Sequence, residues 1–118
     1  MIDERDTLSE NNPRFKYIRF FEVEPYPSEW HQLHGKSYVV VDTYYHRWES
    51  VMFHYKFKLS EEYNESVEIS KDGTYFEIET AFSEGINWTR YEKSTKPIIR
   101  ELTRAEFSVI IMGHELSR

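Results

Sequence analysis

Histidine and acidic side chains are the first candidates for chemistry in this sequence. His31 and His34 have a His-x-x-His spacing that could begin a zinc site. Zinc takes four protein ligands, or three and a water molecule, and the chain has no cysteine to complete such a set. Asp42 and His46 could exchange a proton, but on one strand they would stand about 13 Å apart, at ~3.3 Å per residue. We therefore expect no metal site, no cofactor and no enzymatic activity.

Two arginines stand among aromatic and aliphatic residues in strand-like segments. A guanidinium group in such surroundings must be paired, stacked on a ring or directed into a cleft. The simpler interpretation is an ion pair, with Glu92 or Asp42 as the partner, or a stack on an aromatic ring. The functional interpretation is a pocket in which rings and guanidinium groups hold a flat, anionic ligand such as a nucleotide. The residues of this hypothetical pocket are Arg19, Tyr44, Trp48, Tyr55, Trp88 and Arg90.

A second set of residues could bind a protein. The formal net charge is −6, which disfavours nucleic acid and anionic lipid as direct partners and suits a basic protein. Solubility is the simpler role of such a charge. Aromatic residues make up 17% of the chain, and aromatic side chains are enriched at the energetic centres of protein interfaces. The acidic residues that we expect to point outward on one hairpin are Glu68, Glu77 and Glu79.

These observations favour a non-enzymatic protein–protein interaction module, such as an inhibitor or an immunity-type protein, that acts through an acidic, aromatic-rich surface. A small-molecule-binding domain with the arginine and aromatic pocket is the alternative. An exposed edge strand could also pair two copies into a homodimer. The chain lacks cysteine, a signal-like apolar run near its start and any run of membrane-spanning length. We therefore expect a cytoplasmic protein without disulfides or membrane contact.

The sequence pattern predicts that these residues are positioned by one α+β domain over residues 1–118. Residues 1–13 read as an arm or a short helix, and residues 14–102 as a strongly curved antiparallel meander of about six strands. Strand-like alternation and residues of high β-propensity support the sheet. The predicted strands cover residues 14–24, 37–48, 51–59, 65–70, 74–82, 86–92 and 97–102.

The C-terminal helix has the clearest local signal, and we expect it over residues 103–117, packed on the sheet. Thr103 and Glu106 form a Thr-x-x-Glu capping box, in which each side chain can bind the backbone N–H of the other residue. Phe107, Ile110 and Ile111 follow at the spacing of one helix face. The regular helix is predicted to run from Arg104 to Leu116.

The register of the hairpin over residues 37–59 stays open at this point. A two-residue turn at Glu49 and Ser50 would place Tyr44 and Trp48 on the core face, as the ligand pocket requires. A longer loop reverses the parity and places Val39, Val41, Thr43 and Tyr45 there instead. We favour the longer loop, because it buries fewer unpaired polar groups.

Overall fold

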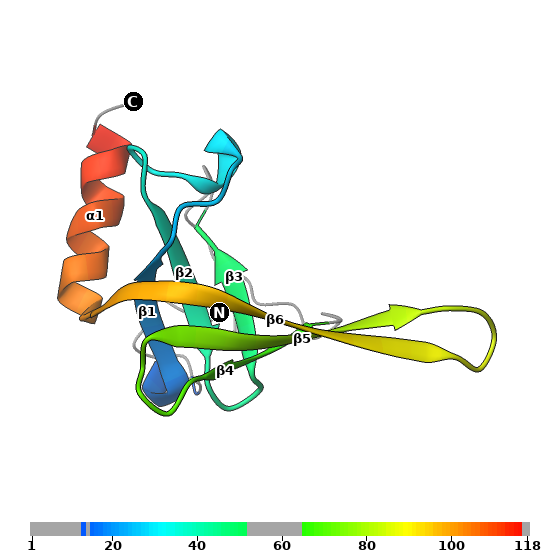
Figure 1. Cartoon of the computed structure of the whole chain (residues 1–118). Coiled ribbons are helices and arrows are strands. Elements are labelled where there is room, and N and C mark those ends of the chain that lie inside the picture. Colours follow the sequence, from blue (N-terminus) through cyan, green and yellow to red (C-terminus); the bar gives the residue numbers. More distant parts are fainter. Residues whose placement is uncertain (1–12, 14, 52–64, 117–118) are drawn as a thin grey trace.

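The computed structural model describes residues 13, 15–51 and 65–116, and Figure 1 shows how their elements are arranged. The predictions for residues 1–12 and for most of the strand over residues 51–59 lie outside the described residues. The described elements are η1 (Phe15–Tyr17), β1 (Ile18–Val23), η2 (Glu29–His31), β2 (Ser37–Asp42), β3 (Arg47–Ser50), β4 (Glu65–Ile69), β5 (Tyr75–Ser83), β6 (Thr89–Leu102) and α1 (Arg104–Leu116).

The strands form one antiparallel sheet in the order β3-β2-β1-β6-β5-β4. This is a six-stranded meander in which the first strand also pairs with the last, and with the C-terminal helix it confirms the predicted α+β class. The outer strands β3 and β4 approach each other, because Val67 N–H donates to the carbonyl of His46 at 2.9 Å and Arg47 donates to the carbonyl of Glu65 at 3.1 Å. They form no ladder, so the sheet is curved but not closed.

The central strands β1 and β2 are buried on both faces, which explains their nearly continuous apolar sequences. One face packs under α1, where the rings of Phe20 and Phe107 stack with centroids 4.4 Å apart. The opposite face packs against β3, β4 and β5, where Phe76 meets Phe21 and Trp48 edge to face. The first cluster consists of Ile18, Phe20, Leu33, Tyr38, Val40, Val51, Leu102, Phe107 and Ile111. The second consists of Phe21, Val23, Val39, Val41, Trp48, Val67, Phe76 and Ile78.

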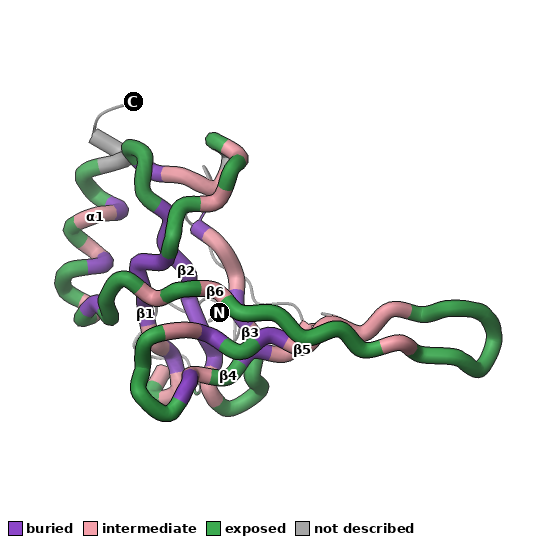
Figure 2. The backbone as a smooth tube through the Cα atoms, in the orientation of Figure 1, coloured by how far each residue is buried: buried purple, intermediate pink, exposed green. Residues whose placement is uncertain are grey.

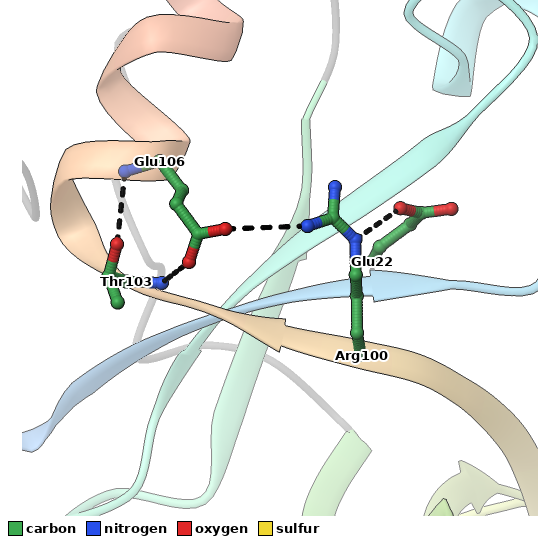
Figure 3. Close-up of polar contacts among 4 residues, drawn as sticks. All are labelled: Glu22, Arg100, Thr103 and Glu106. Carbon is green, nitrogen blue, oxygen red and sulfur yellow. Dashed lines mark hydrogen bonds and ion pairs between the residues drawn. The ribbon is translucent and has the colours of Figure 1, made fainter.

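Helix α1 begins and ends where the sequence predicts. The hydroxyl of Thr103 accepts a hydrogen bond from Glu106 N–H at 3.1 Å, and the carboxylate of Glu106 accepts one from Thr103 N–H at 2.9 Å (Figure 3). The bond from Thr103 N–H stabilises the ionised carboxylate, so it holds the pKa of Glu106 below its usual range. The capping box is therefore formed as predicted.

The same carboxylate is joined to the centre of the sheet through Arg100. The guanidinium of Arg100 contacts Glu106 at 3.4 Å and Glu22 at 3.0 Å (Figure 3). Glu22 lies on β1, opposite both Arg100 on β6 and Tyr38 on β2, and its side chain is only 8% exposed. Burial and the neighbouring charge of Glu22 raise the pKa of the Tyr38 phenol. A buried carboxylate is thus matched by one cation from the neighbouring strand.

The chain reverses direction earlier than predicted after β2. The strand ends at Asp42, whose carboxylate accepts hydrogen bonds from Tyr44 N–H and Tyr45 N–H at 3.0 and 3.3 Å. Four residues, 43–46, then form the turn, and Arg47 pairs opposite Asp42. Both predicted registers placed the turn near residue 49 and are therefore wrong, because the side chain of Asp42 closes the turn locally. The segment predicted as a turn instead lies in β3.

The last part of the sheet is one strand instead of the two predicted pieces. β6 pairs with β5 without interruption from Thr89↔Ser83 to Pro97↔Tyr75. Pro97 is tolerated inside this strand because its backbone nitrogen faces away from β5, and its carbonyl accepts a hydrogen bond from Glu24 N–H at 3.1 Å. Residues 98–102 of β6 lie beside β1, and residues 92–96 lie opposite the part of β5 that also pairs with β4. Residues 81–91 extend beyond β4 as a projecting hairpin (Figure 1).

Candidate protein-binding surface

An open groove lies on the outer face of β4, β5 and β6. Its volume is about 440 Å³. The groove is lined by Ser66, Glu68, Glu77, Ile78, Glu79, Lys93, Ser94 and Thr95. The opposite face of the same strands carries Val67 and Phe76 into the core, so strand alternation directs the carboxylates outward. The three acidic residues that were predicted to share an outward face therefore line one concave surface.

The strand register concentrates negative charge in this acidic groove. Glu68 on β4 stands directly opposite Glu77 on β5, and Glu79 stands opposite Ser66 on one side and Lys93 on the other. His46 reaches Glu68 at 3.8 Å. Within the described residues, neither Glu77 nor Glu79 forms an ion pair. The sequence predicted the three carboxylates but not Lys93 or the concavity, since both depend on which residues pair across three strands.

The two arginines of the hypothetical ligand pocket lie in different parts of the molecule, and each is paired. Arg19 on β1 makes two hydrogen bonds with the carboxylate of Glu101, at 2.5 and 2.8 Å, which raise its pKa. Arg90, on the projecting hairpin, binds Glu84 at 2.6 Å, contacts Glu92 and stands 4.7 Å above the ring of Phe82. An ion pair and a ring stack were the simpler interpretation of these residues.

The aromatic residues of that pocket are also distributed over several elements. Trp48 is buried against Phe76 and donates a hydrogen bond to the carboxylate of Glu65. Tyr44 is 57% exposed on the β2–β3 turn, and Trp88 is 68% exposed on the projecting hairpin. Tyr55 lies outside the described residues. None of the described members lines the acidic groove.

The sequence did not predict one contact that resembles part of a nucleophilic active site. The imidazole Nδ1 of His31 lies 2.7 Å from the hydroxyl of Ser50, and the ring of Tyr26 packs beside it at 5.4 Å. A serine nucleophile also needs a group that orients the histidine and donors for the oxyanion. In the part of the chain that the structure describes, no carboxylate is hydrogen-bonded to His31. The contact is therefore a polar link between η2 and β3.

No group of three or more potential metal ligands converges among the described residues. No described helix is long and apolar enough to cross a membrane.

Comparison with known proteins identifies no relative from which a function could be transferred. No protein-family model, no curated protein sequence and no solved structure matches this chain. The function of the chain therefore has to be inferred from the surface of the molecule.

Proposed function

We propose that this chain is a non-enzymatic protein-binding module, of an inhibitor or immunity type, that holds a basic segment of a partner protein in the acidic groove. The observation that carries the proposal is the direct opposition of Glu68 and Glu77 across β4 and β5. Like charges in that position destabilise a sheet, whereas a lysine or arginine from a partner would neutralise both. The arrangement is therefore unfavourable in the free protein and favourable in a complex.

Apolar surface beside the groove supports the same proposal. Tyr91 lies on β6 two residues from Lys93, on the same face of the strand, and is 62% exposed. Stable interfaces combine an apolar or aromatic contact with charged surroundings, and tyrosine is prominent among energetically important interface residues. Tyr91 thus offers a partner an apolar contact next to the carboxylates. The ligand-pocket alternative stays a prediction and gains no supporting geometry from the described residues.

The test uses the wild-type chain as bait in an extract of its own cells, followed by titration of the purified partner in a calorimeter. Glu77→Gln should weaken binding about tenfold, because it keeps an acceptor oxygen but removes the negative charge that strengthens the hydrogen bond to a basic group. The same substitution should raise the free energy of unfolding of the free protein by about 0.2–1 kcal/mol, because it removes the repulsion with Glu68. Higher salt should weaken the wild-type complex.

Glu29→Gln is the matched control, since Glu29 is an exposed carboxylate on η2, outside the groove. It should change neither affinity nor its dependence on salt. Equal affinities for wild type and Glu77→Gln would contradict the proposal, as would a captured partner whose binding is insensitive to salt.

A further inference from the structure

Strand β6 has two edges, and the β5–β6 register determines to which edge each of its backbone N–H and C=O groups points. Hydrogen bonds from Glu84 N–H to the Trp88 carbonyl, at 2.8 Å, and from Ile98 N–H to the Thr74 carbonyl, at 2.9 Å, continue the β5–β6 register at its two ends. Backbone groups of successive strand residues point to opposite sides. The even-numbered residues of β6 therefore bind β5, and the odd-numbered residues direct their N–H and C=O groups to the other edge.

That other edge is occupied by β1 only at its far end. β1 pairs with β6 from Ile98 onward, and Glu24 N–H reaches the carbonyl of Pro97. Between Thr89 and Thr95, no described strand pairs with β6 on this side. The residues with N–H and C=O groups directed to the open edge are Thr89, Tyr91, Lys93 and Thr95. An edge of this length that no described strand covers is a template for pairing with another strand.

The side chains along the edge are complementary to a second copy of themselves. We propose that β6 forms the interface of a homodimer, in which the two copies of the strand pair antiparallel about a two-fold axis at Tyr91. In this register Arg90 of each copy stands opposite Glu92 of the other, and the two Tyr91 rings are neighbours. Opposite charges and aromatic pairs directly across a ladder both stabilise it.

The neighbouring registers lack this complementarity. An axis at Glu92 sets the two Glu92 carboxylates against each other. An axis at Lys93 sets the two Lys93 side chains against each other and places Arg90 opposite Lys96. Like charges directly opposite are unfavourable, so the axis at Tyr91 is preferred.

The dimer also covers apolar surface that the single chain exposes. Trp88 follows the same ladder and would lie opposite Ser94 of the second copy, so its exposed ring gains a strand neighbour. A two-fold axis perpendicular to the sheet keeps both acidic grooves on one face. The paired edge is short, so the dimer is reversible and its population rises with concentration.

The first test measures molar mass by light scattering over a concentration series from the micromolar to the millimolar range. Tyr91→Pro removes an N–H that is not bonded to β5, together with its partner in the second copy, so the dissociation constant should rise about tenfold or more. Tyr91→Val is the matched control, because it removes the ring but keeps the N–H and suits a strand. It should retain most of the association.

Charge exchange gives a second variant set that leaves the backbone unchanged. Arg90→Glu should weaken the dimer, and adding Glu92→Arg in the same chain should restore it. A wild-type chain that stays monomeric throughout the series overturns the proposal, and so does an unchanged dimer in Tyr91→Pro.

The native chain has no cysteine, so single cysteines can determine the register. Tyr91→Cys should form a disulfide-linked dimer under mild oxidation, because the two residues face each other across the axis. Lys93→Cys should not, because its two copies would stand about 13 Å apart along the strands, at ~3.3 Å per residue. Efficient cross-linking through residue 93 instead of residue 91 would overturn the proposed axis.

Discussion

Strand β6 passes through two regions of the molecule that differ in the strands flanking it and in the core beneath it. Residues 98–102 lie in the body, next to β1, and end in the buried Leu102 under the helix. Residues 89–91 lie in the projecting hairpin and are exposed apart from the half-buried Arg90, and the tube of the hairpin is almost entirely exposed (Figure 2). At the end of the hairpin Ile86 is 98% exposed, whereas Val23, Val39 and Val40 in the body are fully buried.

This difference indicates that the body of the sheet stabilises the fold, whereas the projecting hairpin is exposed and can contact another molecule. A two-stranded ribbon is marginally stable by itself, so the hairpin depends on its continuity with the body. The body in turn gains little from the hairpin, since Ile86 and Trp88 bury little surface there. Substitutions in the two regions should therefore have very different effects on stability.

The largest effect is expected in the body, for Phe107→Ala. Phe107 is fully buried and stacks on Phe20, so its loss leaves a cavity between α1 and the sheet. The free energy of unfolding should fall by about 3–5 kcal/mol, as measured by denaturant titration. Val109→Ala, on the exposed side of the same helix, is the control and should change it by less than about 0.5 kcal/mol. Similar losses for both would contradict the assigned helix face.

A smaller effect is expected at the junction of strand and helix, for Thr103→Ala. The substitution removes the hydroxyl that caps Glu106 N–H and should lower the free energy of unfolding by about 1 kcal/mol. Thr103→Ser keeps the hydroxyl and should lose much less. If the serine and alanine variants lost equal stability, the loss would come from the side-chain methyl group and not from the cap.

Glu49→Gln should have a still smaller effect that depends on pH. Burial on β3 raises the pKa of Glu49 above its usual range, so folding favours the protonated form. Its contribution to stability is present below the unfolded pKa and is lost as pH rises through the folded pKa. Glu49→Gln should therefore be more stable than wild type at neutral pH, and the difference should disappear below the usual carboxyl range. Denaturant titrations at both pH values test this, and a constant difference would contradict it.

The smallest effect is expected in the projecting hairpin, for Trp88→Ala. The ring is 68% exposed, and its residue is held by a backbone hydrogen bond with Glu84. Under dilute, monomeric conditions the free energy of unfolding should change by less than about 0.5 kcal/mol. A thermal or denaturant unfolding curve measures the change. A loss comparable to that of Phe107→Ala would remove the contrast between the two regions.

The sequence predicted the elements that are specified by neighbouring residues. Helix α1 and its capping box depend on Thr103, Glu106 and the helical spacing that follows them, and all three are local. The turn between β4 and β5 is equally local, with Gly73 at a φ of +74°. There Asp72 accepts hydrogen bonds from Thr74 and Ser70, which lower its pKa. Each of these elements is specified by residues that lie within a few positions of one another in the sequence.

What the sequence could not predict depends on contacts between distant residues. The turn after β2 is closed by Asp42, which the sequence analysis placed in the middle of a strand over residues 37–48. Arg19 takes Glu101 as its partner, 82 positions away, and only the β1–β6 pairing brings them together. The acidic groove likewise requires the register of three strands, although its carboxylates were recognisable individually.

The pairing of β1 with β6 also has a consequence for how the chain acquires its structure. The central ladder joins residues near position 20 to residues near position 100, as in Phe20↔Leu102. Contacts of such high sequence separation form slowly, since a long loop must close before they contribute. During synthesis β1 can pair with β2 but waits for β6 until residues 89–102 have left the ribosome. Strand β1, although central in the finished sheet, therefore gains its second neighbour late in folding.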